Sequence, residues 1–178
     1  MVRSPFSSLK VLIVDQDSFA ANLMNQVLLS FELGGIHAER RLSSAIEAIK
    51  ETKVDLVLCD WLIDEDYPLA LIDFIRKDPD CPNHKIPIIM CTGFTEISRV
   101  IQARDSGVNE IIAKPIAPHN VLKKLQAVVS SGRQFVASDA YVGPDRRRRA
   151  IDHGGPERRG KYGLKQEQID TVMNEQEK

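Results

Sequence analysis

The apolar residues of this chain fall into short runs separated by segments with helical spacing. Five runs predict strands, the second of them more weakly than the others. They lie at 10–14, 36–40, 56–59, 86–91 and 110–113. Between the runs, apolar residues recur three and four positions apart, as in Phe19, Leu23 and Val27, which predicts helices. Strands this apolar need cover on both faces, so the alternation predicts an α/β domain with a five-stranded, doubly wound parallel sheet.

Capping residues mark where several of the predicted helices begin. Asp17 stands at the start of the first helix, Ser43 and Ser44 at the start of the second, and Thr95 at the start of the fourth. Such side chains accept hydrogen bonds from the free N–H groups of a first helical turn. We therefore expect each helix to begin at these residues.

The pattern changes after Ser130, where Gly, Pro, Arg and Asp dominate. We predict a short N-terminal extension at 1–8, one folded domain at 9–130 and an irregular tail at 131–178. The tail repeats a Gly-Pro-acid-Arg-Arg unit at 143–147 and 155–159. Its last part, 164–174, places three apolar residues on one side of a helix, which predicts a short terminal helix.

Composition agrees with a globular domain and adds a charge asymmetry. The chain is 43% hydrophobic and 28% charged, with a formal net charge of −1, but residues 143–165 carry eight Lys and Arg against three Asp and Glu. No stretch approaches the length of about 18 apolar residues that a membrane span needs, so we expect a cytoplasmic protein without membrane contact. Cys59, Cys81 and Cys91 lack metal-ligand spacing, and we expect buried, reduced thiols.

Polar residues follow four of the predicted strands. Asp15 comes after the first strand, Asp60 after the third, Thr92 after the fourth and Lys114 after the fifth. In open parallel sheets, ligands bind outside the carboxyl ends of the strands, so these four side chains are expected to converge. The first strand leads into acidic residues rather than a Gly-rich loop, which argues against a nucleotide or flavin enzyme.

The four side chains suit phosphoryl transfer to a carboxylate. Ionised Asp60 can attack phosphorus and form an acyl phosphate. Asp15 can help to hold a Mg²⁺ ion, whose other ligands are waters and substrate oxygens. Lys114 can neutralise one phosphoryl oxygen, and the Thr92 hydroxyl can donate a hydrogen bond to another.

These residues, in this order and spacing, resemble the receiver domain of two-component response regulators, the CheY-like fold. The motifs that carry the resemblance are Asp15, Asp60-Trp61, Thr92-Gly93 and Lys114-Pro115. The resemblance implies a strand order of 2-1-3-4-5, a phosphoacceptor at Asp60, a switch at Thr92 and a cis Lys114–Pro115 bond. It also implies a phosphoryl-accepting signalling domain rather than an enzyme.

Several positions depart from the family pattern. The second acid after the first strand is replaced by Gln16, which can ligate Mg²⁺ through its amide oxygen but brings no charge, so binding of Mg²⁺ is expected to be weak. The other ligands that the resemblance implies are Asp60 and the backbone of Leu62, with Asp64 or Asp66 as compensating carboxylates. Ile111 occupies the position of the aromatic residue that often reports the switch in this family.

We therefore expect a single-domain response regulator that is phosphorylated on Asp60 by a histidine kinase or a phosphotransfer protein. Its output is expected to be contact with a downstream target protein. A second hypothesis, based on Gln16 and on Pro68, which replaces the usual glycine at the end of the loop after Asp60, is a pseudo-receiver that serves as an interaction module without phosphorylation. A homodimer is left open.

The arginine-rich tail has two interpretations. A flexible cationic segment can bind phosphates of nucleic acid, or it can contact a partner protein or the acidic surface of the domain itself. The acidic residues among the arginines, and the lack of an aromatic stacking platform, favour a protein contact. The arginines concerned are Arg146, Arg147, Arg148, Arg149, Arg158 and Arg159.

Overall fold

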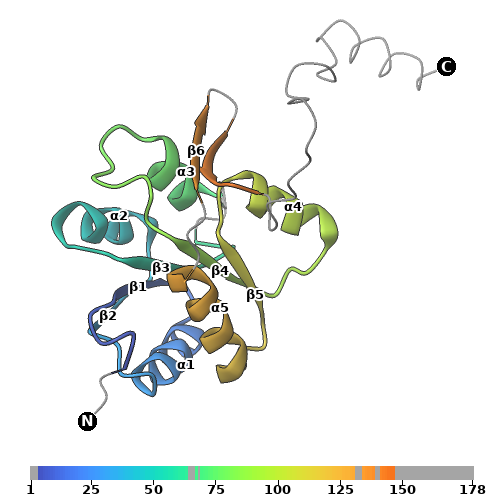
Figure 1. The fold of residues 1–178 in the computed structure, drawn as a ribbon. Coiled ribbons are helices and arrows are strands. Elements are labelled where there is room, and N and C mark those ends of the chain that lie inside the picture. The colour runs from blue at the N-terminus through green and yellow to red at the C-terminus, as the bar shows by residue number, and fades with distance from the viewer. Residues whose placement is uncertain (1–3, 64–66, 68, 131–133, 139–140, 147–178) are drawn as a thin grey trace, which may run out of the picture. The chain divides into compact units, whose positions relative to one another are not determined.

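The computed structural model describes residues 4–63, 67, 69–130, 134–138 and 141–146, which form one compact unit. The predicted tail helix and the arginines after Arg146 lie outside these residues. Five strands and five helices alternate, as predicted (Figure 1). The strands are β1 (Lys10–Val14), β2 (Gly35–Glu39), β3 (Leu56–Asp60), β4 (Ile88–Thr92) and β5 (Glu110–Ala113). The helices are α1 (Ser18–Leu29), α2 (Leu42–Glu51), α3 (Ala70–Lys77), α4 (Ile97–Asp105) and α5 (Pro118–Ser130).

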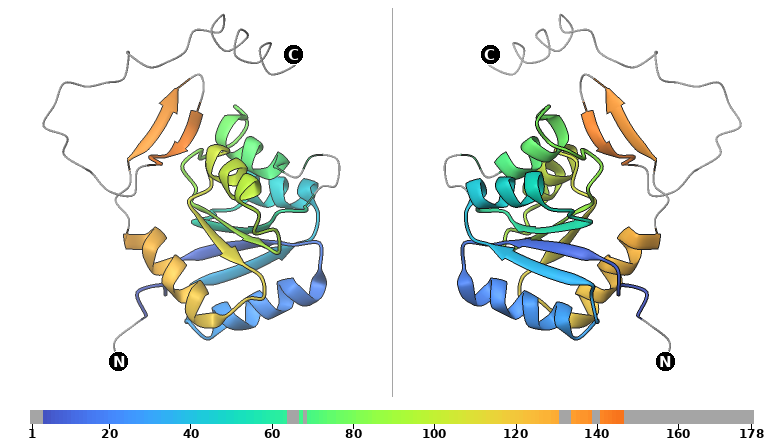
Figure 2. Two further views of the ribbon diagram at one scale, coloured as in Figure 1. Left: turned by 90° about the vertical axis from the view of Figure 1, so that its right-hand side faces the viewer. Right: turned by 90° about the vertical axis from the view of Figure 1, so that its left-hand side faces the viewer.

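The five strands form one parallel sheet in the order β2-β1-β3-β4-β5. Figure 2 shows α1 and α5 on one face and α2, α3 and α4 on the other. Neighbouring residues of a strand point to opposite faces, so Leu12 packs with one group of helices and Ile13 with the other. The near-continuous apolar strands are explained by this double cover, and the predicted fold class is confirmed.

The helix starts agree with the sequence only in part. Asp17 caps α1 as expected, because its carboxylate accepts a hydrogen bond of 2.9 Å from the N–H of Phe19. In contrast, α2 begins at Leu42, before the two serines expected to cap it, and no side chain caps it. The cap of α4 is Glu96 rather than Thr95. The capping preference of serine and threonine is therefore too weak by itself to fix where these two helices begin.

The region expected to be irregular begins instead with an antiparallel hairpin. Its strands are β6 (Phe135–Ser138) and β7 (Tyr141–Pro144). The sequence signal was present as two short runs that contain aromatic and β-branched residues, but the Gly, Pro and Arg residues that follow obscured it. Tyr141 is buried, and its hydroxyl donates a 2.7 Å hydrogen bond to the carbonyl of Pro144. The part of the extension that the structure describes is therefore a hairpin packed on itself through Tyr141.

Arg76 of α3 is buried at the amino ends of β4 and β5, with 2% of its surface exposed. Its guanidinium donates to the carbonyl oxygens of His84 at 2.5 Å, Ile86 at 2.8 Å and Gly107 at 3.1 Å. It also donates to the side-chain oxygen of Asn109 at 3.1 Å. Burial lowers the pKa of Arg76 to about 10, which leaves the side chain charged at neutral pH.

The hairpin lies against this buried arginine. The ring of Phe135 lies over the Arg76 guanidinium, with 5.5 Å between the guanidinium carbon and the ring centroid. Gly107, at a φ of +100°, approaches the hairpin so closely that an added Cβ would lie 2.6 Å from the carbonyl oxygen of Val142. Only glycine fits both the backbone angle and the space.

All three cysteines are buried and free, as predicted. Burial raises the pKa of each thiol: that of Cys91 rises to about 12, and those of Cys59 and Cys81 also rise. Within the described ranges, no helix has the length and apolar character needed to cross a bilayer.

Candidate functional site

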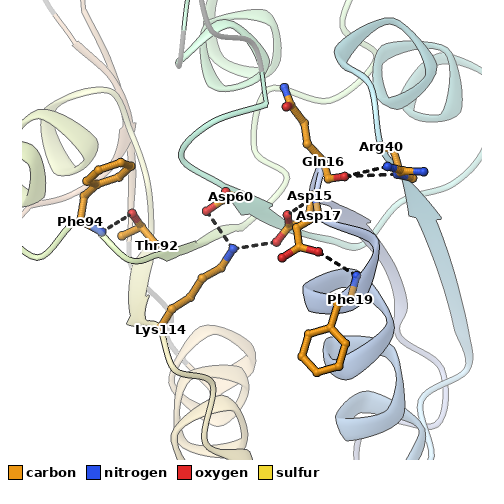
Figure 3. Close-up of polar contacts among 9 residues, drawn as sticks. All are labelled: Asp15, Gln16, Asp17, Phe19, Arg40, Asp60, Thr92, Phe94 and Lys114. Carbon is orange, nitrogen blue, oxygen red and sulfur yellow. Dashed lines mark hydrogen bonds and ion pairs between the residues drawn. The ribbon is translucent and has the colours of Figure 1, made fainter.

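The sheet brings the four predicted side chains to its carboxyl edge. Asp15 directly follows β1, Asp60 and Thr92 end β3 and β4, and Lys114 directly follows β5. Figure 3 shows the amine of Lys114 between the carboxylates of Asp15 and Asp60. The topology explains this convergence, because parallel strands that are neighbours in the sheet end on the same side.

Lys114 bridges the two carboxylates. Its Nζ atom lies 2.8 Å from Oδ2 of Asp15 and 3.2 Å from Oδ1 of Asp60. The Asp15 side chain is 7% exposed, that of Asp60 is 17% exposed and that of Lys114 is 24% exposed, so the pairs are partly shielded from water. The Lys114–Pro115 peptide bond that follows is cis, as the resemblance implied.

The pKa values of Asp60 and Lys114 are both raised, for different reasons. Burial raises the pKa of Asp60, the charge of Lys114 opposes this and the charge of Asp15 adds to it. Burial acts to lower the pKa of Lys114, but the hydrogen bond to Asp15 and the charge of Asp60 outweigh it, and the pKa rises. Lys114 is therefore held as a cation, and its charge compensates the two neighbouring carboxylates.

Thr92 is buried beside this cluster, and its hydroxyl already has a partner. Its Oγ1 atom accepts a 2.9 Å hydrogen bond from the backbone N–H of Phe94. The hydroxyl proton is still able to donate to another acceptor, since a hydroxyl both donates and accepts. Phe94 was not singled out from the sequence, because a backbone donor two residues further on leaves no signal in residue type.

Gln16 does not join the cluster through its side chain. Its side-chain amide nitrogen donates a 2.6 Å hydrogen bond to the backbone carbonyl of Ile63, and the backbone carbonyl of Gln16 accepts two hydrogen bonds from the Arg40 side chain. Figure 3 shows the side chain pointing away from the amine of Lys114. Asp17 also faces elsewhere as the cap of α1, while its backbone N–H donates to Asp15. Gln16 thus ties the loop after β1 to the loop after β3.

The donors that could hold Mg²⁺ are the carboxylates of Asp15 and Asp60. Mg²⁺ prefers oxygen ligands and is commonly bound through one or two carboxylates with waters and phosphate oxygens, so this pair fits the ion. Among the described residues, no three His, Cys, Asp or Glu side chains gather as metal ligands. Leu62 follows Asp60 by two residues and its surface is partly exposed, whereas 64–66 lie outside the described residues.

Two other predicted positions are placed by the structure. Ile111 is half-buried in β5, next to Met90 of β4, and packs against the hydrophobic core on one face of the sheet. Trp61, the second residue of the Asp60-Trp61 motif, is buried, with 4% of its surface exposed.

Of the tail arginines, Arg146 is described and contacts the domain. Its guanidinium forms a 3.0 Å ion pair with Asp105, the last residue of α4, and lies 4.0 Å from the ring centroid of Tyr141. This contact corresponds to the interpretation in which the cationic segment turns back onto an acidic residue of the domain.

Comparisons with known proteins agree with the geometry. The family described as Response regulator receiver domain matches residues 11–126. The chemotaxis protein CheY of Thermotoga maritima is 31% identical over 121 residues, which cover 67% of this chain and 96% of that protein. CheY1 of Helicobacter pylori is 32% identical over 127 residues, 69% of this chain and 98% of that protein.

A longer relative and a solved structure add to this. The phosphate regulon transcriptional regulatory protein PhoB of Pseudomonas aeruginosa is 30% identical over 122 residues, and the match spans 67% of this chain but only 51% of that protein. A response regulator structure from Chloroflexus aurantiacus has a TM-score of 0.63 and 25% identity, covering 70% of this chain and 99% of that one. The family match ends before the β6–β7 hairpin.

Proposed function

This chain belongs to the response regulator receiver family, and on that premise we propose that Asp60 accepts a phosphoryl group from a histidine kinase or phosphotransfer protein. Domains of this family accept phosphoryl groups in two-component signalling and generally bind Mg²⁺. The observation that carries the proposal is the Lys114 amine, which lies 2.8 Å from Asp15 and 3.2 Å from Asp60. A carboxylate nucleophile, a second carboxylate and a fixed cation are thus in contact at one edge of the sheet.

The transfer itself needs few groups from this chain. A carboxylate oxygen of Asp60 forms a bond to phosphorus while the bond from phosphorus to the imidazole nitrogen of a phosphohistidine breaks. The imidazole leaves as a neutral group after taking up a proton from water. Lys114 stays protonated and can move its hydrogen bond from Asp60 to a phosphoryl oxygen, and the Thr92 hydroxyl can donate to another.

The carboxylates of Asp15 and Asp60 would hold a bound Mg²⁺, which would supply positive charge to offset the negative charge of the transferring phosphoryl group. Gln16 has a neutral amide in place of a carboxylate, and the nitrogen of that amide is hydrogen-bonded to the carbonyl of Ile63. We accordingly propose that this receiver binds Mg²⁺ more weakly than one with an acid at position 16. Output would follow through contact with a partner protein, on the face that includes α4, β5 and α5, in the cytoplasm.

The proposal is tested by incubating the protein with Mg²⁺ and a small phosphodonor, such as phosphoramidate, and measuring intact mass. The expected result is one phosphoryl adduct that Asp60→Asn abolishes and that Asp80→Asn retains. Asp80 is a suitable control because it is an exposed aspartate paired with Lys50 at a distance from the site. An adduct that persists in Asp60→Asn would disprove the assignment.

Gln16 favours a second candidate, an interaction module that keeps the fold and works without phosphorylation. The reason is that the described metal donors are limited to two carboxylates, both engaged by Lys114. Titration with Mg²⁺, followed through the emission of Trp61, distinguishes the two: sub-millimolar binding supports the phosphoryl acceptor, and no response up to high concentration supports the module.

A further inference from the structure

We infer that Arg99 of α4 is a positioning residue that couples the phosphoacceptor segment to that helix, an inference that rests on the proposed function. Its guanidinium carbon lies 4.0 Å from the ring centroid of Phe94 and 5.6 Å from that of Trp61. One side chain of α4 therefore contacts aromatic rings from two separate segments of the chain.

Each of these rings is adjacent to a site residue. Trp61 directly follows Asp60 in the chain. Phe94 follows Thr92 by two positions, and its N–H is bound by the Thr92 hydroxyl at 2.9 Å. Arg99 thus connects the ends of β3 and β4 through contacts that begin at the two residues expected to bind the phosphoryl group.

The rings are the main partners of the Arg99 guanidinium. The side chain is 39% exposed, and its Nε lies 3.8 Å from Oε2 of Glu96, a long contact with a carboxylate that is itself 62% exposed. An exposed ion pair of this kind contributes little, whereas a guanidinium over an aromatic face is attracted by the ring quadrupole. Trp61 is buried, so its ring gives the guanidinium a fixed surface.

This arrangement gives phosphorylation a route to α4. A phosphoryl group on Asp60 brings new acceptor oxygens, and a Thr92 hydroxyl that turns towards them weakens its hold on the N–H of Phe94. The ring of Phe94 then shifts against Arg99, and the guanidinium transmits the shift to α4. Ile111 has neither a ring nor a hydroxyl with which to serve the same purpose, so the coupling depends on the arginine.

The test uses the full chain as wild type, Arg99→Ala and Arg99→Lys, with Arg104→Ala as the matched control. Arg104 lies on the same helix, is exposed and pairs with the neighbouring Asp105, away from both rings. Each protein is phosphorylated with phosphoramidate and Mg²⁺, the adduct is measured by intact mass, and hydrogen exchange of the 97–105 amides is compared with and without phosphorylation.

We expect all four proteins to form the adduct. In the wild type and Arg104→Ala, phosphorylation changes the exchange rates of α4, and in Arg99→Ala that change is reduced about two- to fivefold, the range of a partly exposed cation–π contact. In Arg99→Lys the change should be intermediate between those of the wild type and Arg99→Ala, because lysine keeps the charge and loses the planar face. Trp61 is the only tryptophan, so its emission before phosphorylation should also change in Arg99→Ala and stay unchanged in Arg104→Ala.

The outcomes separate the two proposals. If the wild type forms no adduct, the proposed function is wrong and this inference fails with it. If the adduct forms but α4 exchange does not respond in the wild type, or responds equally in Arg99→Ala, the role of Arg99 is wrong while the phosphoacceptor stands.

Discussion

Two cations, Lys114, which is partly exposed, and Arg76, which is buried, lie at opposite edges of the central sheet, and their partners differ in charge. Lys114, at the carboxyl edge, contacts two carboxylates, those of Asp15 and Asp60. Arg76, at the amino edge, donates four hydrogen bonds to three backbone carbonyls and one side-chain amide oxygen. Lys114 is a point charge on a flexible stem, whereas the Arg76 guanidinium is a rigid fork of donors.

The difference separates a chemical role from a structural one. Anionic partners near water can be exchanged for phosphoryl oxygens at little cost, since one charge-assisted bond replaces another. Buried carbonyls have no such substitute, and each loses its bond if the guanidinium is removed. We therefore expect the carboxyl edge to control phosphorylation and the amino edge to control stability.

The largest effect is expected for Arg76→Met, which fills similar space but leaves buried carbonyls without donors. We predict a loss of about 3 to 5 kcal/mol in the free energy of unfolding, the size typical of a broken buried polar network. Urea denaturation followed by circular dichroism measures it. As a control, Arg104→Ala, which removes an exposed arginine, should change the free energy of unfolding by less than about 0.5 kcal/mol. If Arg76→Met also lost less than about 0.5 kcal/mol, the structural role of Arg76 would be contradicted.

The next largest is expected for Tyr141→Ala in the hairpin. Removing a buried ring that contacts Arg146 and a hydroxyl bonded to Pro144 should cost about 2 to 3 kcal/mol. Because the hairpin covers Arg76, we expect the whole domain to unfold at lower urea concentration, with one transition. A domain transition that stays in place would show that the hairpin is an independent appendage.

Lys114→Met should have a smaller effect on stability, about 1 kcal/mol, because the site is partly open to water. The loss of stability in this variant should be smaller in high salt, because salt screens the like-charge repulsion left between Asp15 and Asp60. The same urea experiment in low and high salt measures both values. If Lys114→Met proved as destabilising as Arg76→Met, the two edges would not differ as we propose.

The smallest effect is expected for Asp60→Asn, and its sign is opposite. Burial raises the pKa of Asp60, so the folded protein holds this proton more firmly than the unfolded chain, and stability decreases as pH rises through the folded pKa. The variant should be more stable than wild type at neutral pH by about 0.5 kcal/mol, because it removes a partly buried charge that serves function at the expense of stability. Thermal unfolding at neutral pH and below about pH 3.5 measures the gain, which should vanish in acid, where the carboxyl is neutral in both states.

Much of the fold and site could be predicted because both depend on patterns that lie along the sequence. Apolar runs between helical segments specify strands covered on two faces, and a residue that follows a parallel strand must lie at its carboxyl edge. Asp15, Asp60, Thr92 and Lys114 each end or follow such a strand, so their convergence is predictable from the sequence.

The rest depends on contacts between segments that are distant in sequence. Arg99 meets Trp61 and Phe94 through the packing of α4, and neither spacing nor residue type signals that contact. In the sequence, a buried arginine such as Arg76 cannot be distinguished from an exposed one, because most of its acceptors are backbone carbonyls, which every residue has. The orientation of the Gln16 side chain is not predictable from the sequence either, since an amide can ligate a metal or form a hydrogen bond to a neighbouring loop with equal ease.

The buried thiols have a practical consequence for studying how α4 moves. Cys59, Cys81 and Cys91 are shielded from solvent, and burial raises the pKa of each, so very little reactive thiolate is present at neutral pH. A cysteine introduced at exposed Ile97 would react with maleimide reagents far faster than these three. Spectroscopic probes can thus be attached to the helix of the folded protein without first removing its natural cysteines.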